Sequence, residues 1–237
     1  ERRSSDLPDP DDPNEAILRR PDLYIGDVVS CDQYECSKVG RLEIGFGREG
    51  DKNCYTGGTL YVESVSGFIW NHNQVSLGAP ESVLGKEAFE NWLFTNSGLT
   101  VSHYHSDNGI FASKEWRKNC EVKFQTQSFS GVNAQHMNGK AERSIGIIMQ
   151  MARTFLINVS LSRTGNGVNS TRLWPLAVNH AVWLYNRIPD AETGITPLER
   201  ITGEISDHRD LQRTHVWGCP AFVLADKLSN GQKLPKF

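Results

Sequence analysis

Two short stretches carry most of the information about how this chain folds: His105-Ser106-Asp107-Asn108-Gly109 and Asn138-Gly139-Lys140-Ala141-Glu142-Arg143. The segment 100–106 has the composition of a β-strand. Apolar residues then recur every three or four positions from Ala141 to Val159, which predicts a long amphipathic helix. Asp107 therefore ends a predicted strand. Glu142, 35 residues later, lies in the first turn of the predicted helix.

A third carboxylate, Asp32, lies on the first predicted strand, residues 27–33. Asp27 is its alternative, but an odd offset along a strand places Asp27 on the opposite face, which favours Asp32. Two strand-borne acids and one helix-borne acid can converge at the edge of a sheet, where their oxygens suit Mg²⁺ or Mn²⁺. With two ions, such a site runs phosphodiester chemistry. Taken singly, each acid also has a structural interpretation, as a turn cap or a helix-dipole partner.

The other predicted elements fit an α/β fold with a mixed sheet. Ser66-Gly67 joins two β-rich segments as a hairpin, Ser113 is the N-cap of a short helix, and Thr196-Pro197-Leu198-Glu199 is a capping box. The loop 128–139 carries turn residues and no periodicity. The remaining predictions are strands at 59–65, 68–76, 122–126 and 221–225 and helices at 81–95 and 174–186.

Composition bounds the class of protein. The 237 residues are 38% hydrophobic, with 21 glycines, so the chain can bury a core. No apolar run approaches the roughly 18 residues of a membrane span, so we expect no membrane partner. Residues 1–6 offer neither an initiator methionine nor an apolar signal, which indicates an excised fragment. Five scattered cysteines without a CxxC pair argue against disulfides and zinc and favour an intracellular compartment.

Charge alone gives no clear sign of a nucleic-acid partner. The chain has 25 basic and 28 acidic residues, a net charge of −3, and an ordinary solvated surface is the simpler interpretation. Local basic clusters could still contact a phosphate backbone. They are Lys114, Arg117, Lys118 and Lys123; Lys140, Arg143 and Arg153; and Lys227, Lys233 and Lys236.

The two stretches quoted first resemble the catalytic core of retroviral and retrotransposon integrases. That family has an early Asp, a second Asp in H-[ST]-D-N-G, and a Glu in N-G-x-x-E-R at the spacing found here. Landmarks downstream are similar to those of copia-type LTR retrotransposon integrases: Leu173-Trp174-Pro175, Tyr185-Asn186, Thr196-Pro197-Leu198-Glu199 and Val216-Trp217-Gly218-Cys219-Pro220. The resemblance covers residues 26–237.

The resemblance implies an RNase H-like fold, with a mixed five-stranded sheet flanked by helices and a helical C-terminal extension. It implies the integrase of a copia-like polyprotein, which joins element DNA 3′ ends to target DNA. Asp32, Asp107 and Glu142 would be the catalytic residues and would bind Mg²⁺ (or Mn²⁺). Further residues would contact DNA or shape the active-site loop: Asn108, Gly109, Asn138, Gly139, Lys140 and Arg143.

The resemblance also implies partners and a division of the chain. The partners are double-stranded DNA of the element ends and the target, a homo-oligomer, and other parts of the polyprotein, with the nucleus as the place of integration. The expected domains are a linker at 1–25 after a zinc module, a catalytic core at 26–190 and an incomplete C-terminal extension at 191–237. One departure from the family is that the long helix lacks a dense Lys/Arg stripe, since Gly146 and Met149 follow Glu142 on its face.

Two alternative functions remain. A ribonuclease H-type nuclease shares the fold and usually needs a fourth clustered carboxylate, so the test is whether another acid, for example Glu63, points into the site. A degenerate or domesticated copy would keep the fold as a DNA- or protein-binding module. For His105 we expect a supporting position beside the carboxylates rather than a role as metal ligand, and we expect only His105, not His103, to share the face of Asp107.

Overall fold

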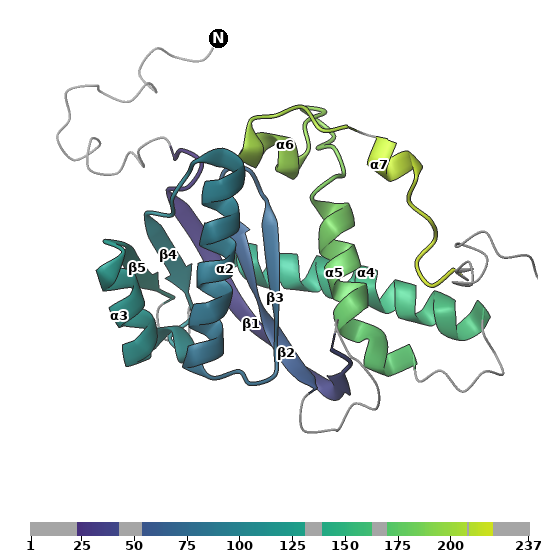
Figure 1. The fold of residues 1–237 in the computed structure, drawn as a ribbon, viewed down its shortest axis with the longest axis horizontal. Coiled ribbons are helices and arrows are strands. Elements are labelled where there is room, and N and C mark those ends of the chain that lie inside the picture. Colours follow the sequence, from purple (N-terminus) through teal and green to yellow (C-terminus); the bar gives the residue numbers. More distant parts are fainter. Residues whose placement is uncertain (1–22, 43–53, 131–138, 163–169, 208, 220–237) are drawn as a thin grey trace, which may run out of the picture.

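The computed structural model describes residues 23–42, 54–130, 139–162, 170–207 and 209–219. Figure 1 shows a sheet with helices packed on both sides. The strands are β1 (Val28–Gly40), β2 (Tyr55–Glu63), β3 (Ile69–Gln74), β4 (His103–Ser106) and β5 (Thr126–Phe129). The α-helices are α2 (Ala79–Ser97), α3 (Lys114–Val122), α4 (Gly139–Ser162), α5 (Trp174–Tyr185), α6 (Pro197–Thr202) and α7 (Arg209–Gln212), with short 3₁₀ turns at Ile110–Ala112 and Ser170–Leu173.

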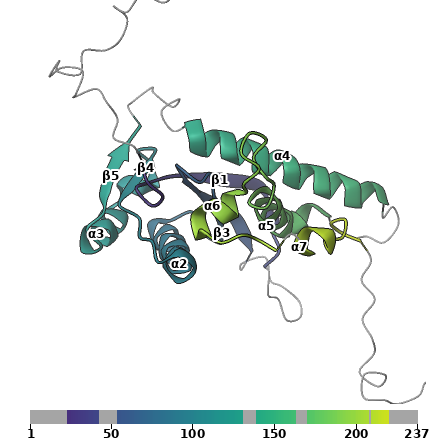
Figure 2. The same ribbon diagram turned by 90° about the horizontal axis from the view of Figure 1, so that it is seen from above.

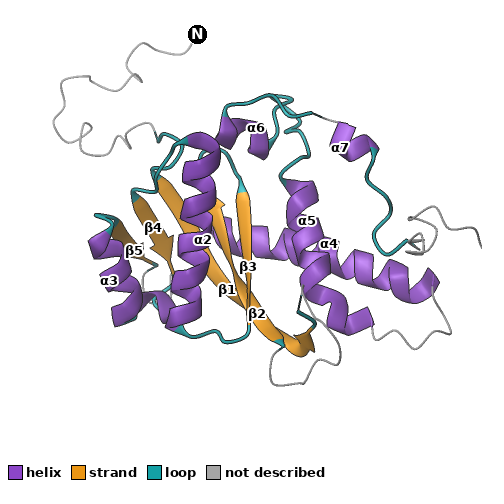
Figure 3. Ribbon diagram, viewed as in Figure 1, coloured by secondary structure: helices purple, strands orange, loops and turns teal. Residues whose placement is uncertain are grey.

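The five strands form one mixed sheet in the order β3-β2-β1-β4-β5. The pairs β3-β2 and β2-β1 are antiparallel, whereas β1-β4 and β4-β5 are parallel. Figure 3 shows the sheet in orange between the purple helices. The sequence-based expectation of an α/β fold with a mixed five-stranded sheet is therefore confirmed.

A tight turn after Glu63 sets the β2–β3 register. Gly67 has φ +72°, a conformation that glycine adopts without strain. The buried Glu63 carboxylate accepts hydrogen bonds from the backbone N–H groups of Val65 (3.1 Å) and Ser66 (2.6 Å) and from the Ser66 hydroxyl (2.6 Å). The predicted hairpin at Ser66-Gly67 is therefore confirmed, and a buried carboxylate holds it.

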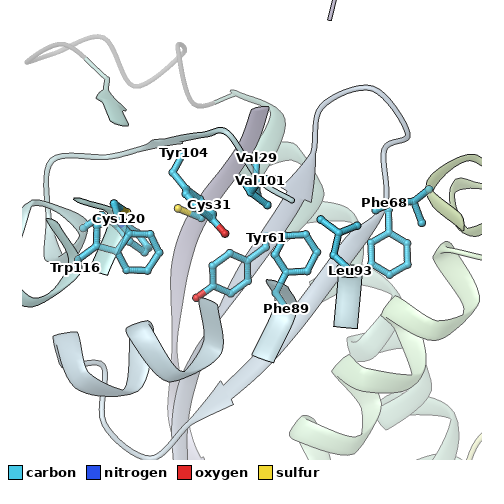
Figure 4. Packing of buried hydrophobic residues seen from close by; sticks show 12 residues of the cluster. Val29, Cys31, Tyr61, Phe68, Phe89, Leu93, Val101, Tyr104, Trp116 and Cys120 are labelled. Atoms are coloured by element: carbon cyan, nitrogen blue, oxygen red, sulfur yellow. The ribbon is translucent and has the colours of Figure 1, made fainter. Parts of the chain in front are cut away.

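Alternation along β1 separates two cores, one on each face of the sheet. Val29 and Cys31 point to the face covered by α2 and α3, where an aromatic-rich cluster forms (Figure 4). Tyr61 stacks there on Phe89, with ring centroids 5.7 Å apart. The opposite face holds Tyr34 and is covered by α4 and α5. In Figure 2 the sheet lies between α4 and the pair α2 and α3. Side chains alternate along β1, so Asp32 lies on the same face as Tyr34, the face that α4 covers.

A buried charge network joins α2 to α3 and to the sheet. Lys86 is fully buried and contacts the Glu90 carboxylate at 2.9 Å, while its ammonium donates to Asn119 Oδ1 at 2.7 Å. Tyr104 and Lys123 donate to the same carboxylate at 2.8 and 2.6 Å. Burial alone would raise the pKa of Glu90, but the nearby ammonium groups outweigh it and the pKa is lowered. A buried carboxylate with this many donors stays ionised.

Most predicted helices lie where expected, and two of them begin at the predicted caps. Ser113 accepts a hydrogen bond from the Trp116 N–H at 3.3 Å, so it caps α3 as predicted. Thr196 and Glu199 make the predicted capping box at the start of α6, with bonds of 3.1 and 2.8 Å. The long helix is also confirmed as α4, Gly139–Ser162.

One predicted strand is wrong. The segment 122–126 does not form a strand: α3 continues to Val122, and β5 begins at Thr126. The helix ends because Phe124 adopts a left-handed conformation, φ 56°, and the N–H of Gln125 bonds back to the Cys120 carbonyl at 2.9 Å. The predicted strand at 221–225 and most of the predicted loop at 128–139 lie outside the described residues.

Within the described part of the chain, α4 alone has the length and apolar composition that could cross a membrane. The same composition occurs in helices that cover the core of a water-facing domain. Ile148 and Ala152 of α4 are buried against the sheet and α5, in the core on that face. The packing thus gives Ile148 and Ala152 partners within the protein, and the absence of a membrane partner stays an expectation.

Candidate active site

Asp32 lies in the middle of β1, on the face that α4 covers. It is opposite Leu60 of β2, which belongs to the core beneath α4 and α5. The Gln33 N–H donates to Asp32 Oδ1 at 2.8 Å, which fixes one carboxylate oxygen. The carboxyl group is only partly exposed. The central strand therefore presents a partly desolvated acid at a defined position.

Asp107 follows β4 directly. In the parallel β1–β4 ladder Cys31 is opposite Ser106, so the next step of the register brings Asp107 beside Asp32. The Asp107 side chain is exposed. A Cβ at Gly109 would lie 3.0 Å from Asp107 Oδ2, so the glycine leaves room for this carboxylate. The parallel pairing of two strands thus brings the two aspartates together.

Glu142 lies in the first turn of α4 and is exposed. The start of the helix is tied to the sheet, because Lys140 donates to the Ser64 carbonyl at 2.7 Å. Arg143 donates to the Gly139 carbonyl at 2.8 Å, within the first turn. Helix α4 contacts β1 and β2, so Glu142 stands over the face that carries Asp32. These bonds fix the helix terminus from which Glu142 projects.

The electrostatics of Asp32 link the three acids. Its pKa is raised from 3.8 to about 6, first because the carboxyl is desolvated and then because Asp107 and Glu142 carry like charges nearby. The hydrogen bond from the Gln33 N–H acts in the opposite direction. Both predicted partners therefore lie close enough to affect the protonation of Asp32. A cluster of acids that repel one another is the arrangement that a cation stabilises.

The donor set fits a hard divalent cation in its chemistry. Three carboxylates offer the oxygen ligands that Mg²⁺ and Mn²⁺ prefer. Among the described residues, however, no three His, Cys, Asp or Glu side chains are already drawn together tightly enough to hold a metal ion. Binding would therefore require the exposed Asp107 and Glu142 side chains to close on Asp32.

Two other carboxylates considered from the sequence lie elsewhere. Asp27 precedes β1, and its Oδ2 accepts from the Tyr24 N–H at 2.7 Å, so it stabilises a turn. Glu63 points to the α2 side of the sheet with Tyr61, opposite the face of Asp32. Its carboxylate is used by the hairpin and by the Gly26 N–H, at 3.3 Å. Neither residue supplies a fourth acid to this site.

The expectation that only His105 shares the face of Asp107 is wrong. His103, His105 and Asp107 are two residues apart along an extended chain, so all three have the same orientation. Both histidines contact the hydroxyl of Ser128 on β5, at 2.7 and 2.8 Å. Sequence reasoning missed Ser128, because a serine in a strand next to a turn-rich loop has no distinguishing pattern.

The remaining predicted site residues have simple positions. Asn108 is exposed directly after Asp107, and Lys140 and Arg143 are exposed on the first turn of α4. Asn138 lies outside the described residues, as do the basic residues Lys227, Lys233 and Lys236. The first basic cluster, by contrast, lies on and after α3, on the other side of the sheet from the three acids.

Comparisons with known proteins concern the fold. No family model matches this chain, and no curated protein matches its sequence. A chain of the simian T-cell lymphotropic virus intasome, solved in complex with PP2A regulatory subunit B56 gamma, is 16% identical with a TM-score of 0.56, over 77% of this chain and 56% of that one. The catalytic core domain of HTLV-2 integrase, solved with magnesium in a dimeric form, is 17% identical with a TM-score of 0.51, over 76% of this chain and 97% of that one.

These likenesses bear on architecture. The present chain spans 56% of the length of the intasome chain but nearly all of the isolated catalytic core. Identities of 16 and 17% carry the fold and nothing finer. This chain therefore has the α/β fold of retroviral integrase catalytic cores, a mixed five-stranded sheet flanked by helices.

Proposed function

We propose that this chain is the catalytic domain of an integrase, a polynucleotidyl transferase and endonuclease that joins DNA 3′ ends to target DNA. One observation carries the proposal: Asp32, Asp107 and Glu142 face the same side of the sheet, and the latter two raise the pKa of Asp32. The fold shared with retroviral integrase cores supports it.

Asp32, Asp107 and Glu142 would hold Mg²⁺ or Mn²⁺. Bound there, the metal would supply Lewis acidity for the attacking hydroxyl and the leaving oxygen of a phosphodiester. The chain's own contribution is position. The Gln33 N–H orients the Asp32 carboxylate, Gly109 leaves room for Asp107, and the Lys140 bond to Ser64 fixes the start of α4.

The finer assignment is to a copia-like retrotransposon. It rests on the downstream landmarks, of which Leu173-Trp174-Pro175 and Thr196-Pro197-Leu198-Glu199 form the starts of α5 and α6. With it we propose double-stranded DNA of the element ends and the target as substrates, the rest of the polyprotein as a partner and the nucleus as the place of action. The HTLV-2 core was solved as a dimer with magnesium, which favours a homo-oligomer and a magnesium requirement here.

The ribonuclease H alternative loses one candidate for its fourth carboxylate. Glu63, the example considered, lies on the opposite face and is engaged by the hairpin. A degenerate module that only binds DNA or protein would not need to keep the three acids, and all three are present. The transferase therefore remains the function that the site supports best.

A strand-transfer assay tests the proposal. The chain and its longer parent protein are incubated with oligonucleotides of the element ends, supercoiled target DNA and Mg²⁺ or Mn²⁺. Joined products are expected, and they should disappear with EDTA and in Asp107→Asn. Cleavage of an RNA–DNA hybrid without DNA joining would instead support the ribonuclease.

A further inference from the structure

The first turn of α4, which carries Glu142, is attached to the sheet through a lysine side chain. Lys140 Nζ donates to the Ser64 carbonyl at 2.7 Å, across 76 positions of the sequence. The other cation of this turn, Arg143, donates to the Gly139 carbonyl of the same helix. Of these two cations, Lys140 is therefore the one that joins the turn to another element.

The carbonyl that accepts this bond belongs to a turn with little freedom. Ser64 donates its own N–H to the Val28 carbonyl at 2.9 Å, and Gly67 donates to the Glu63 carbonyl at 3.1 Å. The Glu63 carboxylate is fully buried and accepts four further hydrogen bonds. The donors are the N–H groups of Gly26, Val65 and Ser66 and the Ser66 hydroxyl. The backbone on both sides of the Ser64 carbonyl is thus bonded, which fixes the carbonyl on the sheet.

The start of α4 has little apolar contact of its own. Helix ends fray, because their last backbone groups lack partners within the helix. Over residues 139–144 the buried side chains are small ones, those of Ala141 and Ser144. The first large side chain of the helix that is fully buried is that of Ile148, more than a turn beyond Glu142. The Lys140 bond is therefore a main attachment of the turn that carries Glu142.

The attachment matters because the three acids still have to close on a cation. Among the described residues no three acidic or metal-binding side chains are drawn together for a metal ion. If the backbone of the first turn is held, Glu142 can approach Asp32 and Asp107 by rotation of its side chain alone. If the turn frays, the same approach must also order the backbone, which adds conformational entropy to the cost.

We propose that Glu63 and Lys140 are positioning residues for Glu142: Glu63 holds the 63–67 turn, and Lys140 fastens the catalytic end of α4 to that turn. Lys140 then acts within the protein, whereas the family resemblance would use it as a DNA contact. The effect on catalysis rests on the proposed transferase function. The attachment itself does not, since it follows from the hydrogen bonds between α4, the turn and the start of β1.

Amide hydrogen exchange tests the attachment without metal or DNA. Lys140→Met should raise the exchange rates of the amides of residues 143–147 about tenfold, because loss of a charge-assisted hydrogen bond favours opening of the first turns. The amides of β1 should exchange as in the wild type, which shows that the sheet is intact. Lys140→Arg keeps a long cationic donor and should restore slow exchange. Unchanged rates at 143–147 in Lys140→Met overturn the proposal.

Lys38→Met is the charge-matched control. Lys38 is exposed near the end of β1, and its removal should leave exchange at 143–147 as in the wild type. An equal rise in this variant would trace the effect to net charge and overturn the proposal.

Glu63→Gln tests the other half of the attachment. It should raise exchange at 143–147 in the wild-type background but add nothing in Lys140→Met, because Glu63 acts on the helix through that lysine. Ser66→Ala removes one donor to Glu63 and takes its place if Glu63→Gln does not fold. A further rise of equal size in the Lys140→Met background would overturn the role of Glu63.

Strand transfer then separates positioning from DNA contact. Lys140→Met should lower kcat about tenfold with little change in KM, and Lys140→Arg should recover the rate. The salt dependence of DNA binding should be the same in Lys140→Met as in the wild type. A slope of log K against log salt that falls by about 0.9, as for one lost phosphate contact, or a raised KM at wild-type kcat overturns the proposal. A wild-type chain that shows the expected exchange rates but joins no DNA counts against the proposed function and leaves the attachment standing.

Discussion

Asp32 is a residue whose surroundings disfavour the charged form of its side chain. Asp32 is partly desolvated and lies near two further carboxylates, so its protonated form is favoured in the folded protein. Functional sites often contain charged groups that reduce the stability of the folded protein, and favourable interactions elsewhere in the fold must offset that loss. Without metal, the pH dependence of stability should therefore report on this carboxyl.

Asp32→Asn tests this dependence. The pKa of Asp32 is higher in the folded than in the unfolded chain, so the native state binds more protons between about pH 4 and pH 6. The stabilisation is present below pH 4 and is lost as the pH rises through about 6. Allowing for solvent screening at a partly exposed carboxyl, the loss is about 1–2 kcal/mol, or about 3–6 °C in Tm. Asp32→Asn should escape this loss.

Thermal melts in EDTA at pH 4.5 and pH 7.5 provide the measurement. The Tm of Asp32→Asn relative to the wild type should rise between the two values. Asp27→Asn, in the turn before β1, is the control and should show no such gain. An equal change in wild type and Asp32→Asn would mean that the Asp32 carboxyl is not destabilised in the fold.

Gly109 is the second residue with a specific consequence. A methyl group there would lie 3.0 Å from Asp107 Oδ2, so Gly109→Ala should displace that carboxylate by a few tenths of an ångström. Misplacement of a reacting group costs rate steeply, and we expect roughly a tenfold loss of strand transfer. Stability should change little, because position 109 is exposed. Gly146→Ala is the control, since a Cβ there meets nothing within 4 Å.

At the scale of elements, the contact between α2 and α3 depends on a buried cation. Lys86 is fully buried and serves Glu90 and Asn119, whereas Lys123 serves the same Glu90 with a third of its side chain exposed. Removing one partner of a buried ion pair leaves an uncompensated charge, which costs more than the loss of a surface pair. The two lysines thus contribute unequally to one carboxylate.

Lys86→Met and Lys123→Met measure this difference in denaturant unfolding. Lys86→Met should reduce the free energy of unfolding by about 3 kcal/mol, the low end for a broken buried pair, because Glu90 keeps its other donors. Lys123→Met should cost less than about 1 kcal/mol. Equal effects would show that burial does not decide the strength of these pairs.

For the whole molecule, the site is a meeting of distant segments. Asp32 comes from β1, Asp107 from the end of β4 and Glu142 from α4, and the sheet register and the packing of α4 bring them together. Groups that share one set of ligands act as a unit, so their losses are not additive. We therefore expect the losses of activity in variants of these acids to be non-additive, although the acids come from different strands and helices.

Asp107→Asn, Glu142→Gln and the double variant test that unit in the strand-transfer assay. Each single change should remove nearly all metal-dependent joining, and the double change should remove no more than either alone. Asp27→Asn should stay near the wild-type rate. Single losses that multiply in the double variant would mean that the two acids act independently.

The sequence by itself predicted most of the helices and strands and singled out the three acids. Hydrophobic periodicity gave α4, the Ser113 and Thr196 caps gave the starts of α3 and α6, and strand alternation favoured Asp32 over Asp27. These signals are local, because a cap or a periodic face acts within a few residues of itself. They failed at 122–126, where the left-handed Phe124 and its neighbouring bonds set the boundary.

Only the tertiary structure decided which residues from distant parts of the sequence lie next to one another. The position of Asp107 beside Asp32 needs the parallel β1–β4 register, and the use of Glu63 as a turn clamp needs the hairpin to close around it. The bridge from Ser128 to both histidines needs β5 to pair with β4 in one register. These are long-range contacts, and their energy depends on the packing of the whole sheet, which no local pattern encodes.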